Sequence, residues 1–257
     1  MSRIYLSSTL MWNSSLEEIF DWTCRSGLDG IELWAQHFFA RGYSREKFRC
    51  LSALYSQKGC LHSQSWDLNL ASLNSGIRAQ SVEEVKRSID LAVSLDLSEV
   101  TVHPGHKTMS ADIADYEANL RQSLQELVEY AESRHIRLSL EIMEKIPKEF
   151  VTDMEAMQRV CGDLFSRCVY TLDIAHCDSE QEAIGILDAH RDRISKIHIS
   201  NRMGTKFHTP LDTGDYDMEK LLPKLMQYDL PFVIEGLDLA KDFPIAKRNV
   251  AFVQTVI

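Results

Sequence analysis

The sequence lacks the features of a membrane or secreted protein. It contains no run of about 18 apolar residues, so we expect no membrane-spanning helix. Its first residues, MSRIYLSSTLMW, lack the long apolar stretch of a signal peptide. Its six cysteines form no CxxC pair, and without a secretory signal we expect them to be reduced thiols. These absences predict a cytoplasmic protein.

Positive charge is scarce as well. The chain has 28 Lys and Arg against 38 Asp and Glu, which gives a formal net charge of −10 at pH 7. Nucleic-acid binding relies on clustered Lys and Arg, so this balance argues against a nucleic-acid partner, although a local basic groove can exist on an acidic protein. No low-complexity stretch, charge block or Pro/Gly/Ser-rich linker divides the chain. We therefore expect a single domain over residues 1–257.

Short β-rich runs alternate with segments of helical periodicity. The eight β-rich runs cover residues 3–9, 29–34, 60–66, 99–103, 136–142, 168–174, 194–200 and 231–236. Eight strands alternating with helices over about 250 residues predict an α/β fold, the (β/α)8 TIM barrel. The alternative is a doubly wound open sheet, but no GxGxxG follows the first run, which removes its commonest nucleotide-binding form.

Local signals mark several helices. Ser14 and Ser15 each stand three residues before a glutamate, which offers overlapping capping boxes, and Ser81 offers another helix start. Gly27 and Gly59 fall where helices are expected to stop. Apolar residues from Tyr116 to Ala131 recur at helical spacing.

A barrel places catalytic groups at the carboxyl ends of its strands. Six consecutive predicted strands carry metal-type ligands at or just beyond that end: His62, His103, Glu141, Asp173, His176, His198 and Glu235. Glu141 and Glu235 each follow an apolar run, RLSL and PFVI, and should be partly buried. A buried carboxylate needs a cation, hydrogen-bond donors or a proton, and a shared divalent metal would satisfy both glutamates.

Each of these residues also has a simpler interpretation. A lone histidine such as His62 is often a hydrogen-bonded core residue, and Asp173 could be a helix N-cap. His37 is interpreted as a surface or loop histidine. Three tryptophans follow the first three strands and could form the wall of a sugar pocket or simply pack at the barrel rim. They are Trp12, Trp34 and Trp66.

Seven segments, in order along the chain, resemble the xylose-isomerase-like TIM-barrel superfamily. They are GLDGIELW, LHSQSWDLNLAS, TVHPGH, LSLEIMEK, TLDIAHC, KIHISN and PFVIEG. The superfamily includes sugar and sugar-phosphate isomerases and epimerases, inosose-processing enzymes and endonuclease IV DNA-repair enzymes. The resemblance spans nearly the whole chain and is specific for the superfamily, but it does not choose a substrate.

The resemblance implies a set of metal ligands. In the isomerase and epimerase branch, one divalent metal is held by a Glu, an Asp, a His and a Glu. These correspond to Glu141, Asp173, His198 and Glu235 here. His176 resembles a residue that contacts the substrate near its carbonyl.

The endonuclease IV branch adds further metal ligands, and His62 and His103 match two of them. Its third metal site includes the histidine after the strand-six aspartate and a D-x-H motif, to which His176 and His208 correspond. Lys206 stands where that motif has its aspartate. This departure argues against a third metal and against phosphodiester cleavage.

Such a site suits Mn²⁺, Mg²⁺ or Co²⁺, and Zn²⁺ is compatible. The sequence thus predicts a metal-dependent isomerase or epimerase of a small sugar, sugar phosphate or polyol derivative, acting through an enediolate, with Glu141 and Glu235 as acid and base. Arg202 or Lys206 could hold a hydroxyl or phosphate of the substrate.

Three alternatives stay open. A dehydratase of the inosose or dehydroshikimate type needs the same metal and base. An endonuclease IV-like hydrolase of abasic DNA is favoured by His62 and His103. A sugar-binding barrel without turnover is the non-enzymatic alternative. A homo-oligomer is compatible with the family resemblance.

Overall fold

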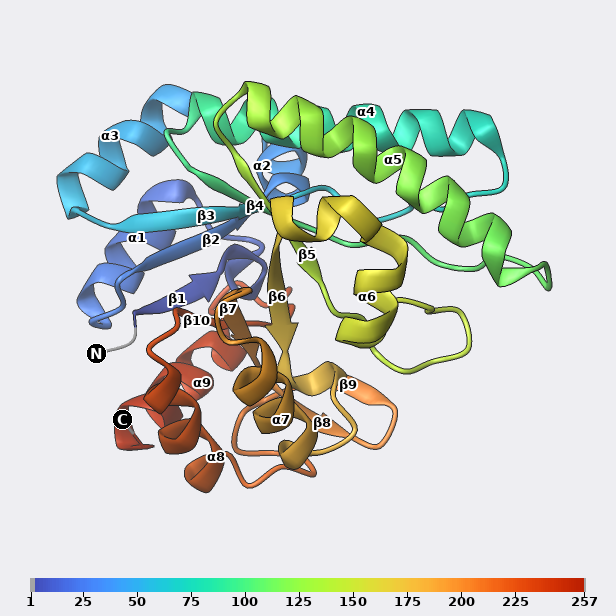
Figure 1. Ribbon diagram of the computed structural model, residues 1–257. Coiled ribbons are helices and arrows are strands. Elements are labelled where there is room, and N and C mark those ends of the chain that lie inside the picture. Colours follow the sequence, from blue (N-terminus) through green and yellow to red (C-terminus); the bar gives the residue numbers. More distant parts are fainter. Residues whose placement is uncertain (1–2, 257) are drawn as a thin grey trace. The chain divides into compact units, whose positions relative to one another are not determined.

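Eight parallel strands form a closed barrel in the order β1-β10-β7-β6-β5-β4-β3-β2. The computed structural model describes residues 3–256, and Figure 1 shows their strands and helices coloured along the chain. The barrel strands are β1 (Ile4–Ser7), β2 (Gly30–Trp34), β3 (Lys58–His62), β4 (Glu99–Val102), β5 (Arg137–Glu141), β6 (Val169–Asp173), β7 (Ile194–Ile199) and β10 (Phe232–Ile234). The predicted (β/α)8 fold is confirmed.

Chain contacts divide the described residues into two compact units. The terminal unit comprises residues 3–59 and 172–256, and the central unit comprises residues 60–171. Both boundaries fall within strands, one inside β3 and one inside β6. The expectation of a single domain over residues 1–257 stays a prediction, and its outermost residues 1, 2 and 257 lie outside the described part.

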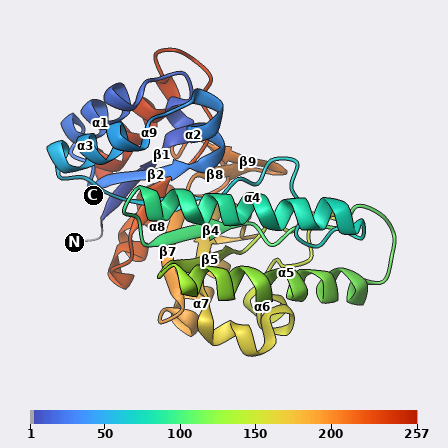
Figure 2. The same cartoon turned by 90° about the horizontal axis from the view of Figure 1, so that it is seen from above.

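In the terminal unit, β1 pairs in parallel with β2 and β10, and β10 pairs with β7. The helices of this unit are α1 (Leu16–Arg25), α2 (Ala35–Arg41), α3 (Arg45–Tyr55), α7 (Glu180–His190), α8 (Met218–Leu225) and α9 (Pro244–Val256). Helices α1 and α3 lie side by side (Figure 2). Helix α1 begins at the predicted capping box, in which Ser15 accepts from the Glu18 N–H and Glu18 accepts from the Ser15 N–H.

In the central unit, β4 pairs in parallel with β3 and β5, and β5 pairs with β6. Helices α4 (Ser75–Ser94) and α5 (Ile113–Ser133) run side by side in both views (Figure 1 and Figure 2), and α6 (Met154–Cys161) follows β5. The predicted apolar stripe of α5 is buried from Tyr116 to Ala131, so its periodicity reflects burial against the rest of the unit. Short 3-10 segments cover Ser8–Met11, Gly162–Arg167, Ile174–His176 and Met226–Tyr228.

Two local predictions are wrong, and one hairpin was not predicted. Ser81 does not start a helix, because α4 already begins after Asn74, and the Ser81 hydroxyl donates inside that helix to the Ile77 carbonyl. Gly59 does not end a helix but lies in β3; helix α3 ends at Ser56, which adopts a left-handed conformation. The hairpin of β8 (Asn201–Met203) and β9 (Lys206–Thr209) was not predicted.

The α5 stripe supports a stability prediction. Leu124 is fully buried, and we expect Leu124→Ala to lower the free energy of unfolding by about 2–5 kcal/mol because it removes buried methyl groups and leaves a cavity. Leu54 on α3 is 74% exposed, so Leu54→Ala should change it by less than about 0.5 kcal/mol. Urea unfolding of both variants measures the difference. Equal midpoints would contradict the burial of this stripe.

The structure bears on two expectations, that the chain has no membrane-spanning helix and that its cysteines are thiols. Between residues 3 and 256, no helix has both the length and the apolar character needed to cross a membrane. All six cysteines are free thiols, and four of them are buried. Burial raises the pKa of the Cys161 thiol to about 11 and that of Cys168 to about 12. These two thiols are therefore protonated at neutral pH and unreactive.

Candidate metal and catalytic site

Within the central unit, three of the predicted residues converge at the carboxyl ends of neighbouring strands. His62 ends β3, His103 follows β4, and Glu141 ends β5. The Glu141 Oε2 atom lies 3.3 Å from His62 Nε2 and 3.2 Å from His103 Nε2. The two Nε2 atoms are 3.2 Å apart. His62 and Glu141 are buried, whereas His103 remains about one-third exposed.

The protonation of His62 follows from its neighbour. Its Nδ1 atom lies 2.9 Å from the carbonyl oxygen of Ser63, which can only accept, so Nδ1 carries the proton. In the neutral ring, Nε2 then directs its lone pair toward Glu141 and His103. Two imidazole nitrogens and a carboxylate oxygen that face one another at about 3 Å need a proton or a cation among them. This donor set fits a divalent metal.

Within the terminal unit, a second group forms around Asp173 at the end of β6. Its Oδ2 atom lies 3.9 Å from His176 Nε2 and 3.7 Å from His208 Nδ1. Its Oδ1 atom accepts a 2.7 Å hydrogen bond from the Ala175 N–H. Asp173 thus caps the 3-10 turn after β6 with one oxygen and turns the other toward two histidines. Both interpretations of this residue, helix cap and candidate ligand, are compatible with the geometry.

His198 and Glu235 also come together in the terminal unit. His198 lies near the end of β7, and Glu235 directly follows β10. The His198 Nδ1 atom is 2.7 Å from Glu235 Oε2, and both side chains are buried. At this distance, an imidazole nitrogen and a carboxylate oxygen share a proton or a cation.

Sequence reasoning missed two charged residues next to His198. Glu32 in β2 is fully buried and lies 3.1 Å from His198 Nε2 through its Oε2 atom. Lys196 in β7 is also buried, with its Nζ atom 3.8 Å from Glu32 Oε1. The signal was present, because Glu32 interrupts the apolar run GIELW just as Glu141 interrupts RLSLE. A charged residue inside an apolar strand predicts a buried partner in both cases.

The tryptophans differ in their surroundings. Trp34 is buried, and Trp66 is 43% exposed. Trp12 stacks on His37 with 4.6 Å between ring centroids. The interpretation of His37 as a surface histidine is wrong: it is fully buried with Nε2 2.9 Å from the Trp12 carbonyl, and burial lowers its pKa to about 4. For Trp12, the structure therefore shows aromatic packing.

The two basic residues that follow β7, Arg202 and Lys206, lie in the β8–β9 hairpin and differ in their contacts. The Arg202 guanidinium donates to the carbonyls of Gly204 and Cys177 and lies 5.0 Å above the Phe207 ring. These contacts tie it to the hairpin and to the turn after β6. Lys206 is exposed. His208, in the same hairpin, reaches Asp173 and also lies 3.1 Å from the Ser200 hydroxyl.

Two further titratable groups in the central unit are perturbed. Burial raises the pKa of the Glu149 carboxyl, and the nearby Glu144 raises it further, against the effect of Lys148 at 3.3 Å. Burial also lowers the pKa of His106. Both residues follow strands that carry candidate ligands, so the loops beyond β4 and β5 contain a carboxyl and an imidazole that favour their neutral forms.

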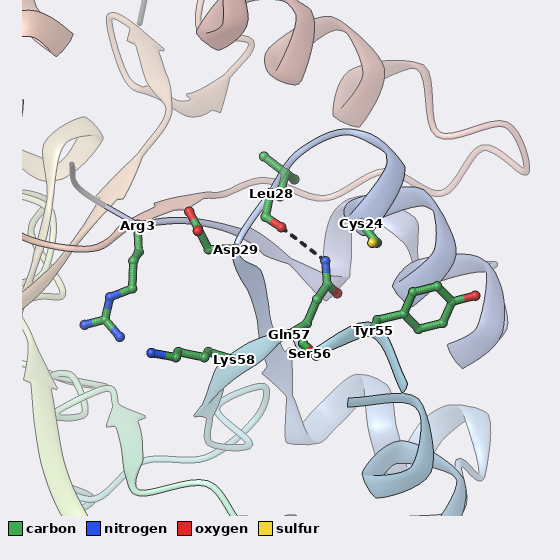
Figure 3. A pocket seen from close by; sticks show the side chains of 8 residues that line it. All are labelled: Arg3, Cys24, Leu28, Asp29, Tyr55, Ser56, Gln57 and Lys58. Atoms are coloured by element: carbon green, nitrogen blue, oxygen red, sulfur yellow. Dashed lines mark hydrogen bonds between the residues drawn. The ribbon is translucent and has the colours of Figure 1, made fainter. Parts of the chain in front are cut away.

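A separate hollow of about 230 Å³ lies in the terminal unit (Figure 3), and none of the candidate ligands is among its lining residues. Arg3 and Asp29 line it just before β1 and β2, and Lys58 lines it at the start of β3. Gln57 donates from Nε2 to the Leu28 carbonyl at its edge. The hollow therefore lies at the amino ends of the strands, the end of a barrel that usually serves stability rather than catalysis.

Comparisons with known proteins place this chain among related barrels. A family model described as xylose isomerase-like TIM barrel matches residues 20–254. An uncharacterized protein of Methanocaldococcus jannaschii, MJ1188, is 26% identical over 233 residues, which cover 89% of this chain and 85% of that protein. A second uncharacterized protein of that organism, MJ1311, is 27% identical over 201 residues, covering 72% of this chain and 66% of that protein.

Solved structures share the same fold. A D-tagatose 3-epimerase-like protein superposes with a TM-score of 0.82 and 22% identity, covering 99% of this chain and 98% of that one. An L-ribulose 3-epimerase superposes with a TM-score of 0.80 and 18% identity, covering 100% of this chain and 94% of that one. A 3-keto-D-glucoside 4-epimerase from E. coli superposes with a TM-score of 0.79 and 16% identity, covering 99% of this chain and 100% of that one. At these identities the likeness demonstrates a common fold.

Proposed function

Because this chain belongs to the xylose isomerase-like TIM-barrel family, we propose that it is a metal-dependent isomerase or epimerase of a small sugar, sugar phosphate or polyol derivative. The observation that carries this proposal is the buried contact of 2.7 Å between His198 Nδ1 and Glu235 Oε2. This contact brings an imidazole nitrogen and a carboxylate oxygen, two kinds of atom that bind metals, together at the carboxyl ends of β7 and β10, where barrel enzymes perform their chemistry. The sugar epimerases among the structural neighbours support the substrate class.

We assign the metal to Glu141, Asp173, His198 and Glu235. Each of these residues stands at or near the carboxyl end of its strand, the end at which a barrel carries its catalytic groups. Three carboxylates and one imidazole suit Mn²⁺, Co²⁺ or Mg²⁺, and Zn²⁺ is compatible. A divalent ion bound there would polarise a substrate carbonyl and the hydroxyl beside it.

The protein's own residues then move the proton. Glu141 removes the proton from the carbon next to the carbonyl, which leaves an enediolate, and Glu235 returns a proton. Return to the same carbon from the opposite face gives an epimer. Return to the neighbouring carbon gives an isomer, provided that the hydroxyl proton also passes from one oxygen of the enediolate to the other. At the start of a turnover the base Glu141 is the ionised carboxylate and Glu235 carries the proton that it returns. A divalent cation beside Glu141 would favour the ionised form that a base requires. We assign His176, whose Nε2 atom lies 3.9 Å from Asp173 Oδ2, to contact with the substrate near its carbonyl.

A second candidate function is an endonuclease IV-like hydrolase of abasic DNA. The converging group of His62, His103 and Glu141 favours it, because a second metal bound there would create a site with several metals. Lys206, in place of an aspartate two residues before His208, opposes it, as does the net charge of −10. A dehydratase on the same scaffold needs the same metal and base, together with an acid that protonates the hydroxyl leaving as water.

The two candidate functions are tested by measuring the metal content of the protein and then its activity in two assays. Protein purified without chelator or nickel affinity is analysed by plasma mass spectrometry and then assayed on a panel of ketoses and on an abasic-site oligonucleotide. About one Mn, Co or Zn per chain with ketose turnover is the result that we expect for a single-metal enzyme of this kind. Two or three zinc ions with DNA incision would favour the hydrolase. No metal, even after titration with Mn²⁺ and Co²⁺, would contradict both.

A further inference from the structure

A buried charged residue stands behind His198, on the side of the ring that is turned away from Glu235. Glu32 approaches His198 Nε2 with both carboxylate oxygens, at 3.1 Å and 3.3 Å. Both side chains are fully buried, although the two residues are 166 positions apart in the sequence. The opposite ring nitrogen, Nδ1, lies 2.7 Å from Glu235. The two nitrogens of one ring therefore face two different carboxylates.

The chemistry of Glu32 decides which nitrogen carries the proton. An ionised carboxylate only accepts hydrogen bonds, so the His198 nitrogen beside it must donate and is Nε2–H. In the neutral ring, Nδ1 then has the free lone pair, which is the form that binds a metal. Nδ1 is the nitrogen beside Glu235, which is itself a proposed metal ligand. The ring therefore directs its free lone pair toward the side on which the metal would bind.

Lys196 gives Glu32 a partner of opposite charge. A buried carboxylate needs such a partner because burial of an unpaired charge is costly. The Lys196 ammonium lies 3.8 Å from Glu32 Oε1 and is itself only 2% exposed. Lys196 and His198 are two residues apart in β7, so their side chains leave the strand on the same face.

We propose that Glu32 is a positioning residue that holds His198 as the Nε2–H tautomer, so that Nδ1 is its metal-binding atom. Lys196 balances the charge of Glu32. Glu32 touches neither metal nor substrate and acts through His198 alone. Carboxylates that accept from the outer nitrogen of a ligating histidine orient the ring and raise its basicity, and their loss typically lowers metal affinity 10–100-fold. The inference rests on the proposed function for the metal itself.

A merely structural role would make Glu32 and Lys196 a buried ion pair that fills space between strands. Removing one partner of such a pair leaves the other charge buried and destabilises the fold. The informative variant therefore removes both charges, Glu32→Gln with Lys196→Met. Glu99→Gln is the matched control, because Glu99 is also a buried strand glutamate paired with a cation, Arg137 at 2.8 Å. It lies at the amino end of β4, remote from the candidate ligands along that strand.

The measurement is Co²⁺ affinity by competition with a chromophoric chelator, alongside the visible spectrum of the bound Co²⁺ and urea unfolding of the metal-free proteins. We expect the double variant to bind Co²⁺ about 10–100-fold more weakly than wild type, with an altered Co²⁺ spectrum and near wild-type metal-free stability. Glu99→Gln should bind as wild type does. Unchanged affinity and spectrum in a folded double variant would overturn the inference.

A second measurement needs no variant. In the Zn²⁺-loaded wild-type protein, nitrogen-15 NMR of the His198 ring should show a protonated Nε2 and a metal-bound Nδ1. The reverse assignment would overturn the inference even if the double variant failed to fold. The two proposals fail differently: a wild-type protein that binds neither Co²⁺ nor Zn²⁺ contradicts the proposed function. A metal bound without any contribution from Glu32 contradicts only this inference.

Discussion

Glu141→Gln is expected to lower kcat by about 10²–10⁴-fold, the range that a positioned general base contributes. The amide keeps the size of the side chain and one oxygen that can still ligate a cation, but it cannot accept the substrate proton. The fall should therefore be larger in kcat than in substrate affinity. Steady-state kinetics on the substrate found in the ketose screen, together with metal content, measures both.

Glu99→Gln is the control for this prediction too. It makes the same chemical change at a buried strand glutamate, but at the amino end of β4 beside Arg137. Its kcat should stay near the wild-type value. If Glu141→Gln retained metal and turned over substrate at a wild-type rate, Glu141 would not be the base, and the acid–base assignment would be wrong.

The second large effect is expected from removing the metal. Chelation should abolish turnover, because carbonyl polarisation disappears with the ion, and Mn²⁺ or Co²⁺ should restore it. The folded state should also lose stability, since an ion present at 100 times its Kd stabilises it by about 2.7 kcal/mol. For a chain of this length, about 2–4 °C per kcal/mol predicts a fall in Tm of roughly 5–10 °C.

Asp173→Asn distinguishes a bound metal from a side effect of the chelator. Asp173 is a proposed ligand whose Oδ1 also caps the turn after β6, and asparagine can preserve that cap while it removes the charge. The Tm of this variant should depend little on added Mn²⁺ or chelator. A wild-type protein that remains active after complete removal of its metal would contradict metal-dependent catalysis.

The sequence was most informative where a charged residue broke an apolar strand. Glu141 and Glu235 were identified because burial of an unpaired carboxylate is costly, and both side chains are indeed buried. The same rule applied to Glu32 would have predicted its burial. It would not have named His198 as its partner, because that contact joins strands β2 and β7.

The local errors have a related cause. Ser81 carries a good capping signal, but the helix extends through it. Asn74 caps the helix about two turns earlier, and the Ser81 hydroxyl finds an acceptor within the helix. His37 looks polar in sequence, yet Trp12 and Tyr43 enclose it. Short-range patterns cannot rank such competing interactions, since distant segments supply the deciding contacts.

By itself the sequence determined the alternation of strands and helices, and with it the barrel. The spacing of its apolar residues has a period of 2 residues in strands and of 3.6 residues in helices. It also determined which strands end in candidate ligands. Only the tertiary structure decided how those ligands are oriented: that His62 holds its proton on Nδ1, and that Glu32 and Lys196 stand behind His198. Orientation depends on distances of about 3 Å between atoms, and hydrogen bonds weaken steeply beyond that range. Such distances arise only when remote strands pair in register.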